Sequence, residues 1–176
     1  MENLNLKNFN MNINVINKSK NPLPKYADSG CSGADVYADI EHINKKFLYG
    51  GAEITVDPET WKDNILIIPP MGRALIPSGI HVDIPKGYEI QVRCRSGLAL
   101  KQGIMVTNGV GTVDESFKGD IGIILTNTGN NPFIVRQGDR IAQLVLMPVT
   151  KIEWNLVDSL EESERGEGGF GHSGIS

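Results

Sequence analysis

The sequence has 176 residues, of which 40% are hydrophobic and 22% are charged, and its formal net charge is −4. This length suits one domain with a substantial core, and the acidic balance argues against binding of nucleic acid through a general cationic surface. No apolar run approaches the ~20 residues that cross a bilayer, and residues 1–14 lack the pattern of a signal peptide. The two cysteines form no disulfide or metal-binding pattern, so we expect a cytoplasmic protein that binds neither membrane nor nucleic acid.

Most of the chain has the pattern of β-strands. Apolar and polar residues alternate in three segments, which predicts strands with one buried face: Met11 to Val15, Ile80 to Ile84 and Tyr88 to Val92. Three continuous apolar runs predict strands that are buried on both faces: Ile65 to Ile68, Ile121 to Leu125 and Ile141 to Met147. Proline and glycine turns separate these segments at short intervals, and a short helix is expected at Ser96 to Gln102. The pattern predicts an all-β fold, either a sandwich, a jelly roll or a barrel.

The chain is expected to consist of one β domain and a C-terminal arm. The domain covers residues 1–157, and residues 41–64, which have mixed polarity, form an extra excursion between two of its core strands. Residues 158–176 contain an acidic run and then a glycine-rich end that cannot build a core by itself. We therefore expect a flexible arm, which is either disordered or folded onto a ligand or a neighbouring subunit.

The glycine-rich end of the arm, Arg165 to Gly174, combines groups that suit a nucleotide. Its five glycines let backbone N–H groups approach an anion, and its arginine offers a planar fork that matches phosphate oxygens. Phe170 has no core to join, so a nucleotide base is a natural partner for its ring. Composition alone leaves this interpretation and a loose, exposed terminus equally open.

Two segments upstream carry further candidate groups. Arg95-Ser96-Gly97 follows a predicted strand and opens the predicted helix, where free N–H groups, a guanidinium and a hydroxyl would face an anion. A capped turn with a salt bridge is the alternative there.

Asn108 to Gly119 is a glycine-containing hairpin whose backbone groups could recognise a pyrimidine edge. Its Asp114 is a candidate general base, although an aspartate in a hairpin more often forms a turn.

Taken together, these segments resemble the trimeric dUTPase family, which carries five sequence blocks in a fixed order. The blocks are Ser32 to Val36, Arg95 to Ala99, Asn108 to Gly119, Gly138 to Gln143, and Arg165 to Gly174. The resemblance implies a jelly-roll-like β-sandwich or barrel that assembles as a homotrimer, with exchanged arms and with active sites shared between subunits. It implies hydrolysis of dUTP to dUMP and pyrophosphate, which limits uracil in DNA and supplies dUMP for thymidylate synthesis. Mg²⁺ would be held mainly by the triphosphate and water, with no direct side-chain ligand.

The same resemblance implies roles for single residues. Asp114 would be the base that activates water for attack on the α-phosphorus, and Asp35 would support the site. The phosphate-binding residues would be Arg95, Ser96, Gly97, Gln143, Arg165 and Ser173. The residues that contact the base and the sugar would be Asn108, Gly111, Val113, Phe117 and Phe170.

Two positions depart from the family pattern, and two other functions are open. Phe117 stands where the family usually has tyrosine, and Ser116 stands where an acidic residue is common.

A dCTP deaminase-like enzyme shares the fold, but apolar Ile124 occupies the position expected for its catalytic glutamate. A nucleotide-binding regulatory module is the other alternative, against which the intact Asp114 and Arg165 argue.

Overall fold

The computed structural model describes residues 11–56 and 64–169. Its strands are β1 (Asn14–Asn17), β2 (Ala34–Tyr37), β3 (Leu48–Tyr49), β4 (Glu53–Val56), β5 (Asn64–Ile68), β6 (Arg73–Ile76), β7 (Ile80–Asp83), β8 (Tyr88–Arg93), β9 (Ile104–Val106), β10 (Gly111–Val113), β11 (Ile123–Asn127), β12 (Phe133–Arg136) and β13 (Arg140–Pro148). The helix α1 covers Ser96–Gln102, as the sequence predicts, and two short 3₁₀ helices cover Ile40–His42 (η1) and Lys45–Phe47 (η2). The described residues therefore confirm the predicted all-β fold.

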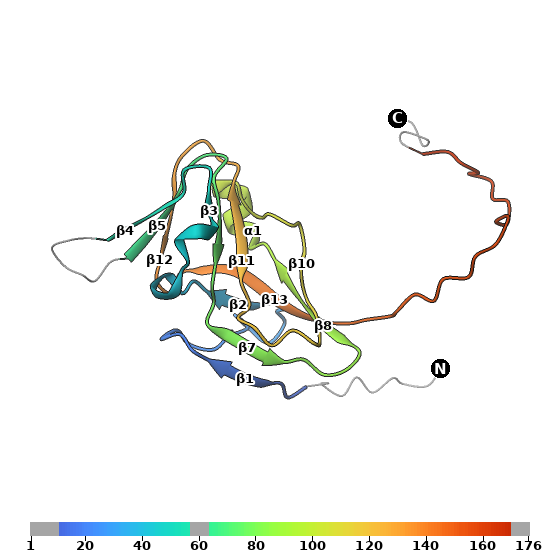
Figure 1. Ribbon diagram of the computed structural model, residues 1–176, viewed down its shortest axis with the longest axis horizontal. Helices are drawn as coiled ribbons and strands as arrows, with labels where there is room; N and C mark the ends of the chain where they lie inside the picture. The colour runs from blue at the N-terminus through green and yellow to red at the C-terminus, as the bar shows by residue number, and fades with distance from the viewer. Residues whose placement is uncertain (1–10, 57–63, 170–176) are drawn as a thin grey trace.

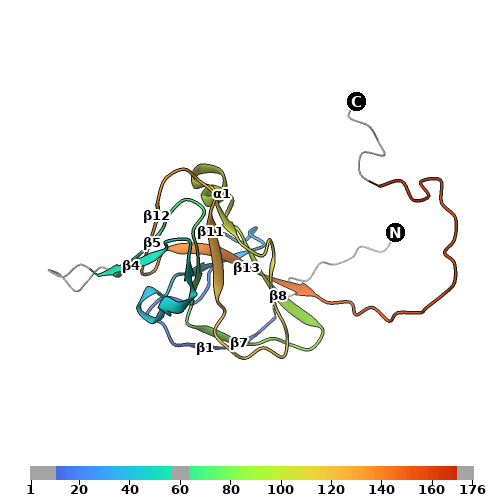
Figure 2. The same cartoon turned by 45° about the horizontal axis from the view of Figure 1, so that its top comes forward.

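The strands form antiparallel sheets around one core. Two sheets have four strands each, in the orders β10-β8-β13-β2 and β3-β6-β11-β9. A three-stranded sheet, β12-β5-β4, and the pair β1-β7 complete the arrangement in Figures 1 and 2. Buried side chains from the three larger sheets belong to a single hydrophobic cluster, which includes Val36, Leu66 and Ile123. Many neighbouring strands are far apart in sequence, which is typical of a jelly roll and not of a simple meander.

Burial on both faces, predicted for three apolar runs, is correct for one of them. Buried residues occupy both faces of β13 between Ile141 and Val145. In β11 the burial alternates, so Ile123 and Leu125 are buried while Ile124 is only half-buried. The same alternation occurs in β5, where Leu66 and Ile68 are fully buried but their neighbours are not. The prediction was wrong there because, among the described residues, no second layer fully covers the outer face of either strand.

The excursion between the first core strands is built from local elements. After η1 and η2, β3 adds an edge strand to β6, and β4 pairs with β5 as a hairpin in register from Glu53↔Ile67 to Val56↔Asn64. Figures 1 and 2 show β4 and β5 projecting from the body. Since β5 also pairs with β12 and contributes to the core, the C-terminal end of the predicted excursion already belongs to the main fold.

The chain leaves the body directly after β13. The chain from residue 150 onward, which includes the predicted arm 158–176, is called the C-terminal arm below. Its described part, residues 150–169, is extended and runs away from the sheets in Figures 1 and 2. Large apolar side chains on the arm are open to solvent, and Trp154 and Leu156 are 87% and 98% exposed. Exposed apolar groups of this size usually mark a contact surface, so the arm has the character of a segment that packs on another molecule.

Candidate functional site

A buried carboxylate organises the first group of candidate residues. Asp35, on β2, is 4% exposed, and its Oδ1 accepts a hydrogen bond from Arg95 Nε at 3.0 Å. Its Oδ2 accepts a hydrogen bond from Arg140 Nη1 at 3.0 Å, and Gln143 Nε2 donates to Oδ1 at 3.4 Å. These four residues are called the Asp35 cluster below. The strand β13, which carries Arg140 and Gln143, pairs with β2, which carries Asp35, and with β8, which ends two residues before Arg95. These pairings bring the four residues together.

Glycine in the first sequence block makes room for the cluster. A Cβ atom at Gly33 would lie 3.0 Å from Gln143 Cβ, which is tighter than ordinary van der Waals contact. Any larger residue would therefore press against the Gln143 side chain on β13. The block Ser32 to Val36 thus contributes both the carboxylate of Asp35 and the space that its partners need.

The Asp35 cluster borders a polar hollow of about 510 Å³. Three arginines line this hollow, Arg95, Arg136 and Arg140, together with the single carboxylate of Asp139. Since Asp35 supplies one negative charge to two guanidinium groups, the cluster keeps a net positive charge. Planar guanidinium groups fixed in this way suit the oxygens of a phosphate.

The first residues of α1 lie beside this cluster and are open to solvent. Ser96 and Gly97 are exposed, and a Cβ atom added at Gly97 would meet no atom within 4 Å. The first N–H groups of a helix have no partner within the helix, so they are available to an anion. The structure therefore brings Arg95, Ser96, Gly97, Gln143 and Asp35 into one region.

The second group of candidates lies on the hairpin between β9 and β10. Gly109 has a φ of 74°, a conformation that favours glycine, and Gly111 faces Val92 of β8 so closely that a Cβ atom would lie 3.0 Å from Val92 Cβ. Asn108 is exposed at the same turn. Val113 is only 7% exposed and belongs to the core, so its backbone alone is available to a ligand.

The loop after β10 presents one free carboxylate and one aromatic ring. Asp114 is exposed, and among the described residues its carboxylate has no hydrogen-bond partner. The adjacent Glu115 is held, because its Oε2 accepts a hydrogen bond from Gly87 N at 2.7 Å. The Phe117 ring is 44% exposed and lies over Gly119, where a Cβ atom would approach the ring Cζ to 2.6 Å. Glycine at position 119 thus leaves the room that the ring occupies.

Within one chain, Asp114 and the Asp35 cluster lie near opposite ends of β8. The register pairs Gly111 with Val92 and Val113 with Ile90, so Asp114 comes level with Glu89 while Gly111 lies toward the other end of the strand. Arg95 follows Glu89 by six residues, two beyond the end of β8, which at ~3.3 Å per residue is a separation of about 20 Å. One chain does not bring Asp114 and the Asp35 cluster together.

The arm residues stand apart from both groups. Arg165 is exposed, and its Nε donates to the Gly168 carbonyl at 2.7 Å. Phe170 and Ser173, which the sequence places in the same motif, lie outside the described residues.

The sequence-derived set omitted Arg140. It lies in the fourth block and shares Asp35 with Arg95, and Arg95 Nη1 also donates to its carbonyl oxygen at 3.0 Å. The available signal was a cation three residues before the assigned Gln143, inside the same block. In the described part of the chain, no three His, Cys, Asp or Glu side chains gather as metal ligands. No described helix has the length and apolarity needed to cross a membrane.

Comparison with known proteins identifies the family of this chain. A sequence model of the dUTPase family matches residues 62–174. The chain is 41% identical over 164 residues to the deoxyuridine 5'-triphosphate nucleotidohydrolase of Finegoldia magna, covering 93% of this chain and 99% of that protein. The chain therefore belongs to the dUTPase family. It is a hydrolase of nucleotide metabolism that converts dUTP to dUMP and pyrophosphate.

Solved phage dUTPases have the same fold. A point mutant of the Staphylococcus bacteriophage 80alpha dUTPase, with dUpNHpp, matches with a TM-score of 0.71 at 23% identity and covers 93% of this chain and 99% of that chain. A mutant dUTPase of phage phi11 of S. aureus, described with a structural Mg(II) ion, has a TM-score of 0.66 at 18% identity. That match covers 86% of this chain and 100% of the phage chain. These matches confirm the dUTPase-like fold.

Proposed function

We propose that Asp114 is the general base of dUTP hydrolysis. A water molecule that attacks the α-phosphorus must lose a proton to a carboxylate within reach. Two carboxylates are adjacent in this loop, but Glu115 is already bonded to Gly87, whereas Asp114 is exposed and has no described partner. This difference is the observation that carries the assignment. A positioned base contributes about 10²–10⁴-fold in rate.

We assign recognition of uracil and deoxyribose to the hairpin and the loop that follows it. Backbone groups between Asn108 and Val113 pair with N3–H and O4 of uracil, whereas cytosine reverses that edge and would leave polar groups unpaired. We assign to the same hairpin the exclusion of a 5-methyl group, through close contact of its backbone with C5 of the base. The Phe117 ring packs on C2′ of the sugar, where the hydroxyl of a ribonucleotide would collide with it.

Phosphate binding belongs to the Asp35 cluster and the start of α1. Arg95, Arg140 and Gln143, with the N–H groups of Ser96 and Gly97, hold phosphate oxygens and stabilise the charge that develops during transfer. Asp35 fixes the two guanidinium groups. Because this donor set is cationic, it fits the triphosphate, and Mg²⁺ would be held mainly by phosphate oxygens and water. When bound, Mg²⁺ neutralises part of the triphosphate charge.

The position of these groups along β8 supports a homotrimer whose sites are shared. If uracil lies at Gly111 and the α-phosphorus lies at Asp114, the substrate extends along β10 away from Arg95 of the same chain. The phosphate-binding groups of a complete site must then come from a second subunit. The arm, with Arg165, Phe170 and Ser173, closes the site from a neighbouring subunit.

We propose that the protein is located in the cytoplasm. Cys31 and Cys94 support this location, since both are free thiols.

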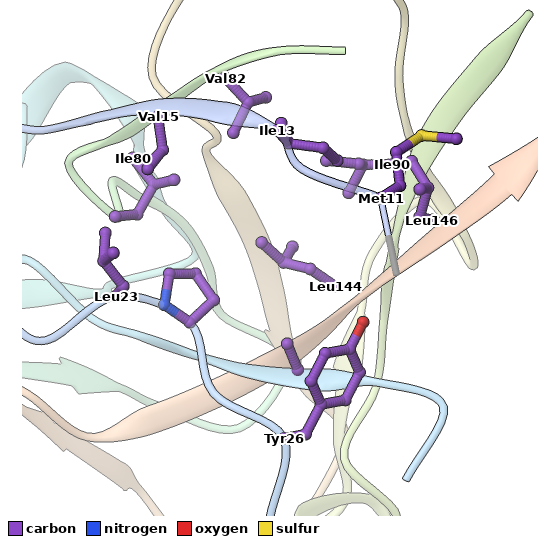
Figure 3. A pocket seen from close by; sticks show the side chains of 12 residues that line it. Met11, Ile13, Val15, Leu23, Tyr26, Ile80, Val82, Ile90, Leu144 and Leu146 are labelled. Carbon is purple, nitrogen blue, oxygen red and sulfur yellow. The ribbon is translucent and has the colours of Figure 1, made fainter. Parts of the chain in front are cut away.

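An apolar groove beside β1 is our candidate for the surface that receives the arm of a neighbouring copy. The groove has a volume of about 260 Å³, and Figure 3 shows apolar side chains of β1, β7, β8 and β13 converging on it. It is lined by Met11, Ile13, Val15, Leu23, Pro24, Tyr26, Ala34, Ile80, Val82, Ile90, Leu144 and Leu146. The arm offers apolar side chains at alternate positions, Ile152, Trp154 and Leu156, which suits an extended segment with one face on this groove.

Mixed trimers test both the base and the shared site. Asp114→Asn and Arg95→Ala are each expected to release almost no pyrophosphate from dUTP in the presence of Mg²⁺. The two variants are then co-expressed in equal amounts. If each site takes Asp114 and Arg95 from different chains, about one quarter of the sites contain both wild-type residues, and about one quarter of the wild-type activity is expected to return. No recovery would mean that each site is built within one chain. A fully active Asp114→Asn enzyme would overturn the assignment of the base.

A further inference from the structure

The loop that carries Asp114 is fastened to the turn between β7 and β8 by a residue that the proposed function leaves unused. The half-buried Glu115 directs its carboxylate to Gly87 N, at a distance of 2.7 Å between Oε2 and nitrogen. A hydrogen bond between a carboxylate and a backbone N–H is short and about twice as strong as a neutral one. Since Glu115 is the next residue after Asp114, this bond fixes the backbone at the place where the base begins.

A second fastening of the same loop is weaker. Lys118 Nζ donates to Asp83 Oδ1 at 2.6 Å and to the Glu115 carbonyl oxygen at 2.9 Å. The two side chains are 55% and 62% exposed, and exposed ion pairs contribute little to stability. At the far end of the loop, Asp120 accepts hydrogen bonds from Ser78 N and Gly79 N. At the end next to Asp114, Phe117 N donates to the Asp114 carbonyl oxygen at 3.0 Å within the loop, and Glu115 makes the bond that ties this end to another turn.

The position of the base depends on the backbone of this loop. The Asp114 carboxylate has no described partner that would fix it, so its place relative to the substrate follows from its main chain. That main chain is anchored by the buried Val113 on one side and by the buried Ile121 on the other, with seven residues between them. A shift of ~1 Å in a catalytic group can cost 10²-fold in rate.

We propose that Glu115 is a positioning residue for dUTP hydrolysis, which holds the Asp114 carboxylate in place by fastening its loop to Gly87. This inference rests on the proposed role of Asp114. It separates the two adjacent carboxylates by function, because one faces the substrate and the other faces the protein. Uracil recognition is affected less, because the hairpin before Asp114 is held independently by the pairing of β10 with β8.

Steady-state kinetics of Glu115 variants test the proposal. Glu115→Ala is expected to lower kcat about 10- to 100-fold, with KM for dUTP changed by less than about threefold. Glu115→Asp keeps the charge but is one methylene too short to reach Gly87, so kcat is expected to fall similarly. Glu115→Gln keeps an acceptor at the same reach and is expected to retain most of the activity. All three variants are expected to keep an acid limb in the pH profile of kcat, because Asp114 is still the base.

Matched controls separate this role from a loss of folding. Glu41→Ala removes a carboxylate whose ion pair with Lys20, at 2.9 Å, lies in the excursion, so its kinetics are expected to match the wild type. Thermal denaturation and sedimentation show whether each variant folds and assembles. If Glu115→Ala does not fold, the comparison of Glu115→Asp with Glu115→Gln decides.

Three outcomes would overturn the proposal in distinguishable ways. Wild-type kcat in Glu115→Ala and Glu115→Asp, with Asp114→Asn inactive, would remove the positioning role and leave the base assignment intact. Equal inactivity of Glu115→Ala and Glu115→Gln, with the acid limb lost, would mean that Glu115 itself exchanges the proton. Full activity of Asp114→Asn would remove the base assignment, and the positioning role would fall with it.

Discussion

At the scale of single residues, Asp35 joins three parts of the chain that are far apart in sequence. Arg95 lies 60 residues later and Arg140 lies 105 residues later, yet both donate to the same carboxylate. The side chain of Asp35 is 6% exposed, whereas those of its arginine partners are 26% and 51% exposed. The carboxylate is thus the buried anchor of the cluster, and the guanidinium groups keep part of their surface for a ligand.

The substitution Asp35→Asn tests this anchoring. The amide offers one acceptor in place of two charged oxygens, so one guanidinium loses its partner, and we expect a destabilisation of about 2 kcal/mol. We also expect a higher KM for dUTP, because the guanidinium groups no longer hold fixed positions. Asn127→Ala is the control, since it also removes a buried polar group but lies away from both candidate sites. A variant at position 35 with unchanged kinetics would show that the cluster does not bind phosphate.

The ion pair between Asp83 and Lys118 predicts that the stability of the fold depends on pH. Its hydrogen bond with Lys118, together with the positive charge of Lys118, lowers the pKa of Asp83 below its ordinary value of 3.8. A carboxyl with a lowered pKa in the folded state stabilises the fold above its unfolded pKa, and this contribution is lost as the pH falls through the folded pKa. The difference in Tm between wild type and Asp83→Asn should therefore be largest at neutral pH and disappear in strong acid. A difference that grows in acid would contradict this linkage.

At the scale of secondary structure, the hairpin of β4 and β5 joins an edge strand of the excursion to a strand of the core. The strand β5 is essential because Leu66 and Ile68 are fully buried and pair with β12. The strand β4 is an edge strand that pairs with β5 alone. The hairpin projects from the body in Figures 1 and 2, away from α1 and from the loop after β10.

Shortening the hairpin tests this division. Thr55 and Ile65 face each other in the register, so a two-residue Asn-Gly turn can replace residues 56–64 and close the hairpin directly. Because both candidate sites are retained, we expect kcat/KM for dUTP to stay within about twofold of the wild type. Pyrophosphate release and Tm measure the result. A large loss of activity in a folded protein would place the tip of the hairpin in the active site.

At the scale of the whole molecule, the single chain is incomplete in two respects. Asp114 and the Asp35 cluster lie near opposite ends of β8, and the arm exposes apolar side chains that its own body leaves uncovered. Both features are resolved if neighbouring copies supply the missing partner. Separate observations on the sheet and on the arm therefore support association with neighbouring copies, as in the proposed trimer.

Truncation before Arg165 tests the closing function of the arm. The core and Ile152 to Leu156 are retained, so we expect a folded trimer that hydrolyses dUTP at only a small fraction of the wild-type rate. Sedimentation and pyrophosphate release measure the two properties separately. Normal activity of the truncated enzyme would show that the glycine-rich end does not close the site.

Charge substitutions in the arm test its contact with the groove. Leu156→Asp places a charge on the apolar face, where burying the leucine contributes about 1.5–3 kcal/mol, and we expect the trimer to dissociate more readily. Asn155→Asp adds the same charge on the opposite face of an extended segment and should leave assembly unchanged. Equal behaviour of the two variants in sedimentation would contradict docking of this face.

The sequence by itself determined the all-β class, the position of α1 and the dUTPase family. These depend on local information, since each alternating segment, turn or sequence block can be recognised within a stretch of about ten residues. Only the tertiary structure decided that Arg140 shares Asp35, that the Val113 side chain belongs to the core, and that one outer face of β5 and of β11 stays partly open. It also decided which of the two adjacent carboxylates is free, because the partner of Glu115 lies 28 residues earlier on another turn. Such contacts depend on how distant strands pack together, and no local pattern records them.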